Sequence, residues 1–272
     1  MLHWDHPQVR ELIRLAVAED VGSGDVTTDA CVPLQSQGMG YFLPKQGLTL
    51  AGTELLPIIF HQEKIEILES DGTHVPMGKV FARVSGSTRR LLTLERTALN
   101  FLQRTCGVAT MTSRFVEAIE GTGCTLLDTR KTSPGMRVLN KLSVRAGGGT
   151  NHRLGLFDAV LIKNNHVDAA GSITQAVENC RSSGRTIEVE VRDLAELDEA
   201  LRCGIRHVLL DNFSPPQVTD AVEQVAGRAK LEVSGNVSLG SVRDYAEAGA
   251  DYISVGALTH SAPAADISFR LK

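Results

Sequence analysis

The first third of the chain combines one helical pattern with several short patterns of strand type. Apolar residues recur every three or four positions from Val9 to Val17, behind a proline, which predicts an amphipathic helix. The helix is expected to stop within residues 19–28, where two glycines and Asp25 favour a turn. Polar and apolar residues alternate at Lys64–Glu69, which predicts a strand with one buried face. Three other runs share this strand type, and together they predict an antiparallel sheet: Gly38–Leu43, Leu48–Ala51 and Val80–Val84.

Two helical patterns follow this region. Residues 91–102 and residues 108–119 both repeat apolar positions at helical spacing, and Gly107 separates them. We therefore expect two successive helices that join a first domain to a second. Arg96 lies on the polar side of the first pattern, where a single arginine is usually a solvated charge.

From Gly121 onward, strand patterns alternate with helical ones. Strand-like runs occur at Thr125–Asp128, Ala159–Ile162, Thr186–Val191, His207–Leu210, Lys230–Val233 and Tyr252–Val255. Amphipathic segments lie between several of them, at Ile173–Cys180, Leu194–Cys203 and Pro216–Val225. This alternation predicts parallel strands, either in a barrel of TIM type or in a doubly wound open sheet. Nearly every strand ends on a polar or glycyl residue, and only a barrel brings all such ends to one mouth, so we favour a barrel with fewer than eight strands.

Composition narrows the class of protein. The 272 residues are 42% hydrophobic and 22% charged, which fits a globular protein of two unequal domains or one large barrel. A formal net charge of -4 argues against a general nucleic-acid-binding protein. Neither a signal peptide nor an apolar run of about 18 residues is recognisable, so we expect a cytoplasmic protein that is not associated with a membrane. The five cysteines lack C-x-x-C spacing and are expected to be free and buried.

One stretch, from Asp128 to His166, concentrates cations beside apolar runs. Because the chain as a whole is negatively charged, this positive charge is local. Lysine and arginine bind carboxylate or phosphate oxygens, and arginine does so with two hydrogen bonds. The stretch therefore predicts an anionic ligand, and its basic residues are Arg130, Lys131, Arg137, Lys141, Arg145, His152, Arg153 and Lys163.

Two acidic residues and two glycine-bearing segments complete the predicted barrel mouth. Glu190 and Asp211 end two of the strand patterns, and Mg²⁺ typically takes one or two carboxylates together with substrate phosphates. Ser234–Asn236 and Ser254–Thr259 follow the last two strands, where barrels often bind a phosphate monoester. The sequence therefore predicts a substrate with a phosphate at one end and a diphosphate at the other.

Several of these residues also fit simpler interpretations. Glu188 and Glu190 would point the same way on a strand, and both would face solvent if that strand were at an edge. If they faced a barrel interior instead, the acidic residues would need cationic partners. Asp211 would also fit a helix cap. His152 and His166 lack the spacing of metal ligands, so a hydrogen-bonding role is the expected one.

A series of short motifs runs in order along nearly the whole chain. The motifs are Glu19-Asp20, Gly24–Thr28, Glu95–Asn100, Asp128–Thr132, Gly147–Arg153, Lys163–His166, Glu188–Val191, Leu210–Asn212, Glu232–Gly235 and Ser254–His260. Together they resemble the quinolinate phosphoribosyltransferase family, the carboxylating nicotinate-nucleotide pyrophosphorylases. Two positions depart from the family pattern: Asn164 stands where Asp is usual, and Asn236 stands where a second Gly is common.

The resemblance implies an α/β fold with an N-terminal α/β sandwich and an incomplete TIM-like α/β barrel. We place the sandwich at residues 1–112, the barrel at 113–265, and a tail that returns to the first domain at 266–272. The resemblance also implies a homodimer in which one subunit's first domain caps the other's barrel, so that Arg96 would serve the partner's site. Whether such dimers assemble further into hexamers stays open.

The resemblance also implies roles for individual residues. Five basic residues would hold the pyridine dicarboxylate and the diphosphate: Arg130, Lys131, His152, Arg153 and Lys163. Glu190 and Asp211 would face the ribose and Mg²⁺. The 5-phosphate would lie on the two loops that contain Ser234, Gly235, Asn236, Ser254 and Gly256. The residues expected to act in catalysis are Lys131, Lys163, Glu190 and Asp211.

The implied reaction joins quinolinate to phosphoribosyl diphosphate in NAD biosynthesis. Diphosphate leaves, the ring nitrogen becomes positive, and that charge stabilises the carbanion formed when CO₂ departs, which gives nicotinate mononucleotide. Three alternatives remain: a phosphoribosyltransferase for another acidic heterocycle, a Schiff-base aldolase that uses Lys163, and a phosphometabolite-binding barrel without activity.

Overall fold

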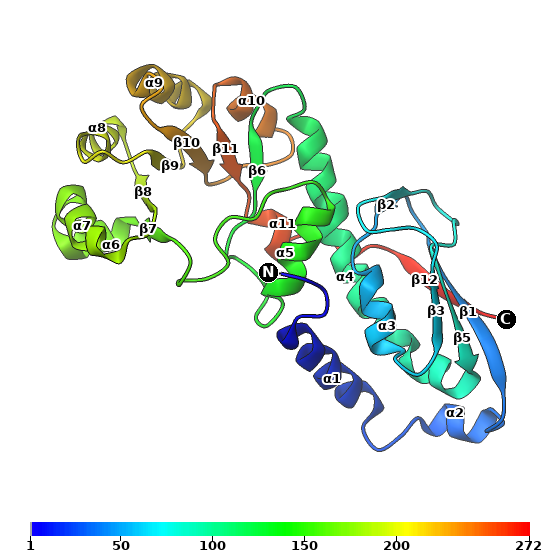
Figure 1. Cartoon of the computed structure of the whole chain (residues 1–272). Coiled ribbons are helices and arrows are strands. Elements are labelled where there is room, and N and C mark those ends of the chain that lie inside the picture. The colour runs from blue at the N-terminus through cyan, green and yellow to red at the C-terminus, as the bar shows by residue number, and fades with distance from the viewer. Residues whose placement is uncertain (1) are drawn as a thin grey trace. The chain divides into compact units, whose positions relative to one another are not determined.

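In the computed structural model, which describes residues 2–272, the chain divides into two compact units (Figure 1). Unit 1 takes the chain up to Ser113, together with Lys131–Gly148 and Ala257–Lys272. Unit 2 consists of Arg114–Arg130 and Gly149–Gly256.

Unit 1 contains a four-stranded antiparallel sheet in the order β12-β1-β5-β3. Its strands are β1 (Gln37–Pro44), β3 (Lys64–Ile67), β5 (Ala82–Ser87) and β12 (Ile267–Leu271). A separate pair joins β2 (Leu48–Thr49) to β4 (His74–Val75). The end of the chain returns to this unit because β12 pairs with β1, where Phe269 lies opposite Phe42. An antiparallel sheet is confirmed for three of the four predicted runs, those of β1, β3 and β5, whereas the run at Leu48–Ala51 contributes β2 to the separate pair. The buried face predicted for Lys64–Glu69 is limited to the partly buried Ile65.

The short helices of unit 1 show what the predicted turn contains. The first helix, α1 (Pro7–Val21), buries Val9 and Ile13 as its pattern predicts. A second helix, α2 (Val26–Cys31), begins within the last three residues of the segment predicted as a turn, after a turn at Gly22 and Ser23. Asp25 is its N-cap, and its carboxylate accepts hydrogen bonds from the Thr28 amide at 2.9 Å and the Thr28 hydroxyl at 2.5 Å. The predicted turn is confirmed at residues 22–23, but the helix that Asp25 caps was missed, because an acidic cap residue resembles a turn former in sequence. Two further short helices are η1 (Thr53–Leu55) and α3 (Leu56–Ile59).

A single helix, α4 (Thr88–Ala118), occupies the region where two helices were expected. Gly107 lies inside it and does not interrupt it. A Cβ atom at this position would come within 2.1 Å of the carbonyl oxygen of Pro263. The glycine is therefore explained by the close approach of another backbone segment, which a sequence pattern does not reveal.

Unit 2 is built on a six-stranded parallel sheet in the order β6-β11-β10-β9-β8-β7. Consecutive strands from β7 to β11 are neighbours, and β11 pairs with β6. Within residues 2–272, no ladder joins β6 to β7, so this is an incomplete barrel. The six strands predicted from the apolar runs are confirmed as β6 (Thr125–Leu127), β7 (Val160–Ile162), β8 (Ile187–Val191), β9 (His207–Asp211), β10 (Lys230–Ser234) and β11 (Tyr252–Ser254).

Helices connect the strands of unit 2, and Figure 1 shows α7 to α10 on the outer side of the sheet. The alternation of strand and helix confirms the predicted α/β class. The helical elements are α6 (Asn164–Ala170), α7 (Ile173–Cys180), η2 (Arg181–Ser183), α8 (Leu194–Arg202), α9 (Pro215–Val225) and α10 (Val242–Glu247).

Two helices that the sequence places within the second domain belong to unit 1. They are α5 (Arg137–Ala146) and α11 (Ala257–His260). Helix α5 belongs to unit 1 because its apolar face is buried there. Val138, Leu139 and Leu142 are part of the same hydrophobic cluster as the buried residues of α1 and β1. Residues 113–265 therefore do not form one uninterrupted compact unit.

Two expectations from composition can also be compared with the structure. No helix within residues 2–272 is long and apolar enough to cross a membrane. The five cysteines are free as expected, but Cys106 alone is buried and Cys31 is exposed. The general tendency of free cysteine to be buried therefore fails for most of these positions.

Candidate functional site

Lys163 and Glu190 meet where β7 and β8 end in unit 2. Lys163 Nζ lies 3.6 Å from Glu190 Oε2, and the Asn164 amide donates to Glu190 Oε1 at 3.3 Å. The Glu190 side chain is 12% exposed, and β8 lies between β7 and β9. The interpretation of Glu190 as a solvent-facing residue of an edge strand is therefore wrong.

His166 lies one helical turn beyond Lys163. Its Nδ1 accepts a hydrogen bond from the backbone N–H of Lys163 at 2.9 Å, at the start of α6. This contact confirms the hydrogen-bonding role expected for His166. It also orients the backbone from which the Lys163 side chain extends.

Asp211 is the last residue of β9, next to the strand that carries Glu190. Its Oδ1 accepts a hydrogen bond from the Asn212 side chain at 3.0 Å. Asp211 does not cap the following helix, because Ser214 is the N-cap of α9 and the Ser214 amide donates to Gln217 Oε1 at 2.9 Å. The cap interpretation is therefore wrong, and Asp211 lies with Glu190 at the carboxyl ends of adjacent strands.

The loop after β10 approaches the end of β9 very closely. The Asn212 amide donates to the Ser234 carbonyl at 2.8 Å, and the Asn236 side chain donates to Asn212 Oδ1 at 3.2 Å. Gly235 has a φ of 101°, and a Cβ atom there would come within 2.1 Å of Asn212 Oδ1. Only glycine fits both the conformation and the space, so this loop is built to present its backbone at the strand ends.

The loop after β11 provides the two remaining residues predicted to bind phosphate. Ser254 ends β11 and is 4% exposed, and its hydroxyl is directed at the Val233 carbonyl at 3.5 Å. Gly256 is only partly buried and immediately precedes α11. Of the two, Gly256 is the more accessible.

Asp128 fixes the segment that carries His152 and Arg153. Asp128 is fully buried at the end of β6, and its carboxylate accepts hydrogen bonds from the His152 amide and the Asn151 side chain, both at 2.8 Å. The Asp128 amide in turn donates to the Thr150 carbonyl at 3.1 Å. Sequence reasoning placed Asp128 in a motif but assigned it no role. Its position at the end of an apolar run and before a basic segment could have indicated a structural role at the site.

Arg130 and Arg153 form a cationic pair in unit 2. The pKa of Arg153 is lowered, first by burial and then by the nearby charge of Arg130. Arg153 Nη1 donates to the Ala159 carbonyl at 3.2 Å, and Arg130 Nε is buried without a hydrogen bond within residues 2–272. Glu188 and Asp158 offset the shift of Arg153 only in part, and an anion bound beside the two guanidinium groups would favour the charge of Arg153 further.

A second group of titratable residues lies in the interior of unit 2. His152 Nε2 is 2.9 Å from Glu188 Oε2 and 3.5 Å from Glu232 Oε2, and His207 Nε2 is 3.3 Å from Glu232 Oε2. Burial lowers the pKa of His207, but the two carboxylates outweigh it and the net shift is upward. The roles of Glu188, His207 and Glu232 were not predicted. The one sequence feature that could have indicated a role for Glu188 was its spacing of two residues from Glu190, which places both side chains on the same face of a strand.

The other two predicted site residues, Arg96 and Lys131, belong to unit 1. Arg96 is exposed on α4. The side chain of Lys131 is exposed as well, and its carbonyl accepts a hydrogen bond from the Thr259 hydroxyl at 2.9 Å.

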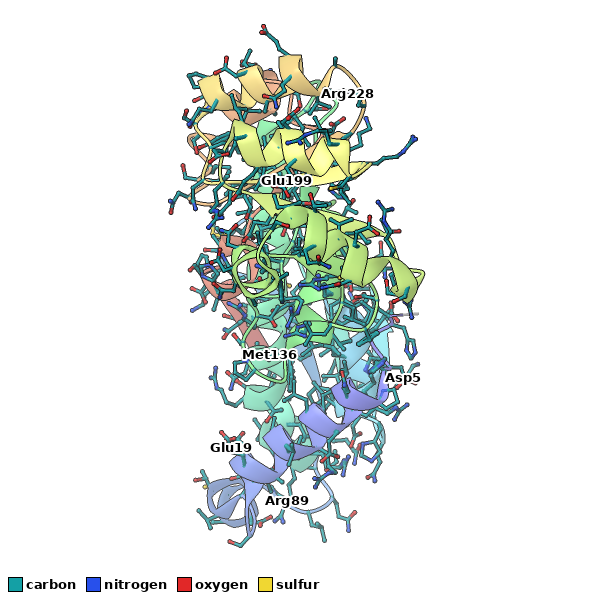
Figure 2. The ribbon with its side chains drawn as sticks, turned by 90° about the vertical axis from the view of Figure 1, so that its left-hand side faces the viewer. Asp5, Glu19, Arg89, Met136, Glu199 and Arg228 are labelled. Carbon is teal, nitrogen blue, oxygen red and sulfur yellow. The ribbon has the colours of Figure 1, made fainter. Side chains whose placement is uncertain are left out.

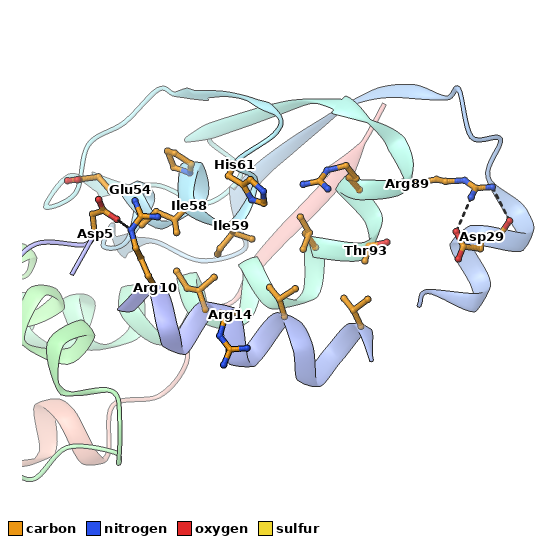
Figure 3. Close-up of a pocket in the computed structure, with 16 residues that line it drawn as sticks. Asp5, Arg10, Arg14, Asp29, Glu54, Ile58, Ile59, His61, Arg89 and Thr93 are labelled. Carbon is orange, nitrogen blue, oxygen red and sulfur yellow. Dashed lines mark hydrogen bonds and ion pairs between the residues drawn. The ribbon is translucent and has the colours of Figure 1, made fainter. Parts of the chain in front are cut away.

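A cavity of about 1090 Å³ lies in unit 1, between α1, α3 and α4 (Figure 3). Each of its four arginines forms an ion pair with an acidic residue, as Arg89 does with Asp29. None of the predicted site residues lines it. Its size alone does not indicate chemistry, and the strand ends of unit 2 are the better candidate because Lys163, Glu190 and Asp211 lie at neighbouring strand ends there.

Comparisons with known proteins agree along the whole chain. Residues 25–106 match the model of the N-terminal domain of quinolinate phosphoribosyl transferase, and residues 108–270 match that of its C-terminal domain. The carboxylating nicotinate-nucleotide pyrophosphorylase of Mycobacterium leprae is 41% identical, over 96% of both chains. The chloroplastic form from Arabidopsis thaliana is 39% identical, over 98% of this chain and 84% of its own length. A solved nicotinate-nucleotide pyrophosphorylase from Francisella tularensis superposes with a TM-score of 0.92 at 38% identity, covering 98% of each chain.

Proposed function

The chain belongs to the quinolinate phosphoribosyl transferase family, and we propose that it transfers phosphoribosyl from phosphoribosyl diphosphate to quinolinate. The products would be diphosphate, CO₂ and nicotinate mononucleotide, a precursor of NAD. The observation that carries this proposal is the pair formed by Arg130 and Arg153, which lies in the same unit as the carboxylates of Glu190 and Asp211. Such a site matches a dianionic acceptor and a diphosphate-bearing donor.

The two arginines are suited to the two carboxylates of quinolinate. A guanidinium group forms paired hydrogen bonds with a carboxylate, and partial burial strengthens that interaction. His152 was predicted to join them as a ligand. Both of its ring nitrogens already have hydrogen-bond partners within the protein, Glu188 and the Arg153 amide. We propose that His152 acts beside the substrate as a support for Arg153.

Glu190 and Asp211 fit a bound Mg²⁺ ion. Among residues 2–272, the one cluster of three or more potential metal ligands is His152, Glu188 and Glu232, so Glu190 and Asp211 do not belong to a closed protein cage. Mg²⁺ usually keeps open positions for water and substrate phosphates, and two carboxylates suffice for it. When bound, the ion would offset negative charge on the diphosphate.

The protein's own groups would act on charge as it develops. The pyridine nitrogen attacks C1 of the ribose while diphosphate leaves, and positive charge builds on the sugar. Glu190 and Asp211 would stabilise that charge, and Lys163 would stabilise the departing diphosphate. The positive ring nitrogen then stabilises the carbanion left by CO₂, and protonation gives the product. The loops around Gly235 and Gly256 would hold the 5-phosphate with backbone amides.

The assembly is part of the same proposal. We propose a homodimer in which the partner subunit's Arg96 completes each site, because Arg96 is exposed on α4 and lies within a family motif. In a mixture of Arg96→Ala and Arg153→Ala subunits, mixed dimers would contain one intact site and recover activity. Mixtures that stay inactive would contradict the shared site. The cytoplasmic location stays a prediction, and some plant relatives are named as chloroplastic or mitochondrial.

The Schiff-base alternative is not supported by the surroundings of Lys163. Its side chain is 46% exposed and lies beside the Glu190 carboxylate. Schiff-base lysines are activated by a desolvated pocket or by a cationic neighbour, and neither is found here among residues 2–272. Borohydride trapping at Lys163 is therefore expected to fail.

The deciding experiment supplies Mg²⁺ and phosphoribosyl diphosphate with either quinolinate or nicotinate. We expect nicotinate mononucleotide from quinolinate, with one CO₂ released for each product formed. Efficient use of nicotinate, without release of CO₂, would assign the chain to another reaction. An absence of product from both acids would favour a binding protein.

A further inference from the structure

The interior of unit 2 contains a polar cluster that the proposed chemistry does not use directly. Glu188 on β8 and Glu232 on β10 are 5% and 1% exposed. Between them lie two imidazole groups, from His152 and from His207 at the start of β9. Buried carboxylates are costly unless they are paired, so a cluster of this kind calls for an explanation.

The hydrogen bonds of His152 determine where its proton lies. The backbone N–H of Arg153 donates to His152 Nδ1 at 2.7 Å, so Nδ1 must present a lone pair. The neutral ring then carries its proton on Nε2, and the nearest acceptor is Glu188 Oε2 at 2.9 Å. The network thus assigns a single tautomer, which Glu188 maintains by accepting the hydrogen bond from Nε2.

This arrangement clamps one residue from two sides. Asp128 accepts the backbone N–H of His152, while Glu188 accepts the ring N–H of the same residue. With both ends fixed, His152 Nδ1 is directed at the amide of Arg153. The backbone from which the Arg153 guanidinium extends is therefore held by a chain of three hydrogen bonds.

We propose that Glu188 is a positioning residue, which holds His152 in its Nε2–H tautomer and thereby places Arg153 for anion binding. This inference rests on the proposed function, because Arg153 is assigned there to the acceptor carboxylates. Glu188 is buried and forms its hydrogen bond with His152, so its positioning effect would reach the substrate through that ring. Its charge also favours the charged form of Arg153 directly.

His207 offsets the buried negative charge of Glu188 and Glu232, which lets Glu188 accept the hydrogen bond from His152. His207 lies between the two carboxylates, 3.9 Å from Glu188 Oε1 and 3.3 Å from Glu232 Oε2. Its raised pKa favours the positive imidazolium, which offsets the buried negative charge. The Glu188 carboxylate, which also lies near Arg153, can then remain charged while it accepts from His152.

A metal ion is the competing explanation, since His152, Glu188 and Glu232 offer ligand atoms within 4.8 Å of one another. A metal on His152 Nε2 would require the proton to lie on Nδ1. That proton would point at the Arg153 amide, whose own N–H already points at Nδ1 from 2.7 Å. Two donors would face each other, so the observed geometry favours the hydrogen-bonded cluster.

The first test uses the free protein and needs no substrate. ¹⁵N spectra of histidine-labelled protein distinguish the two imidazole tautomers, and the His152→Asn variant assigns the signal. We expect the Nε2–H tautomer in the wild type. Glu188→Gln, which keeps an oxygen acceptor, should preserve it, whereas Glu188→Met, which has similar length and no acceptor, should lose it. An Nδ1–H tautomer in the wild type, or stoichiometric metal in the purified protein, would overturn the proposal.

The second test separates positioning from a purely structural role. In Glu188→Met, we expect the KM for quinolinate to rise about tenfold, because a hydrogen bond to a charged group is lost, while the KM for phosphoribosyl diphosphate stays unchanged. The KM for quinolinate of Glu188→Gln should lie between that of Glu188→Met and that of the wild type. A loss of kcat with both KM values unchanged in Glu188→Gln would indicate only a structural role and overturn the proposal.

A matched control is available on the surface of the same unit. Glu199 on α8, labelled in Figure 2, accepts two hydrogen bonds from Thr174, both at 2.8 Å. Glu199→Gln makes the same chemical change and should leave both KM values unaltered. If the wild type forms no nicotinate mononucleotide, the proposed function fails, but the spectra of the free protein still decide whether Glu188 holds His152.

Discussion

Arginines are abundant in both units, yet their partners differ. In unit 1, the four arginines around the cavity of Figure 3 each form an ion pair with an acidic side chain. In unit 2, burial and the charge of Arg130 lower the pKa of Arg153, and the nearby carboxylates of Glu188 and Asp158 offset this only in part. Within residues 2–272, neither arginine comes within ion-pair distance of a carboxylate. Arginines with acidic partners are satisfied by the protein itself, whereas a neighbouring like charge disfavours a cation that a bound anion would favour. The partner of a cation thus indicates function better than its abundance does.

The largest difference between the two units is expected when one arginine is removed from each. Arg153→Ala should lower kcat/KM on the order of 100-fold, since a bidentate charge-assisted interaction is lost. Arg14→Ala, at an exposed ion pair of unit 1, should retain full activity. Steady-state kinetics with circular dichroism as the check on folding measures both. An active Arg153→Ala enzyme would show that the anion site is wrongly placed.

Acidic residues allow the same comparison. Glu190→Gln should lower kcat by about tenfold to 100-fold and raise the Mg²⁺ concentration needed for half-maximal activity, because a carboxylate is lost at the charge-developing centre. Glu66, which pairs with Arg83 at the surface of unit 1, provides the control Glu66→Gln. Mg²⁺ titrations of the two variants test the difference. An unchanged Mg²⁺ requirement in Glu190→Gln would remove Glu190 from the metal site.

A paired arginine of unit 1 should matter for stability instead. Arg89 donates to the Val32 carbonyl at 2.8 Å and to Asp29 at 2.9 and 3.0 Å, which ties α2 to α4. Arg89→Ala should lower the free energy of unfolding by about 1–3 kcal/mol, as expected when such bonds are lost. Urea unfolding measures this, and the KM values should not change. A raised KM for quinolinate would mean that the two regions are less distinct than we infer.

The smallest expected effect concerns pH and the cap of α2. Hydrogen bonds from the Thr28 side chain and backbone lower the pKa of Asp25 in the folded protein. A lowered folded pKa gives stability that is present above the unfolded-state pKa and lost as the pH falls through the folded one. Asp25→Asn keeps a cap residue but cannot titrate. Its stability deficit at neutral pH should therefore shrink below about pH 4. A deficit independent of pH would contradict the assignment.

The sequence predicts the architecture of unit 2 well, because its signals are local. Each apolar run is bounded by polar or glycyl residues, and each becomes a strand at nearly the expected residues. It predicts less of unit 1, where the explanation is often a tertiary contact. Gly107 was interpreted as a helix break, but the structure shows that the Pro263 carbonyl lies against it. The sequence predicts only a turn around Asp25, whereas in the structure Asp25 also caps α2 by accepting from the Thr28 amide.

The candidate site shows the same division. Lys163, Glu190 and Asp211 could be found from the sequence because each lies at or just after the carboxyl end of an apolar strand. The contact between Glu188 and His152 could not, because it joins residues 36 positions apart. Periodicity shows which way a side chain points, but the identity of its partner depends on how the sheet curves.

The most direct test of the contrast between the two units is calorimetric titration of the free protein with quinolinate. We expect saturable binding by the wild type and by Arg14→Ala, and no measurable binding by Arg153→Ala. Binding of quinolinate to Arg153→Ala with wild-type affinity would contradict the account, because the like-charged arginines of unit 2 would then not be the site of the anion.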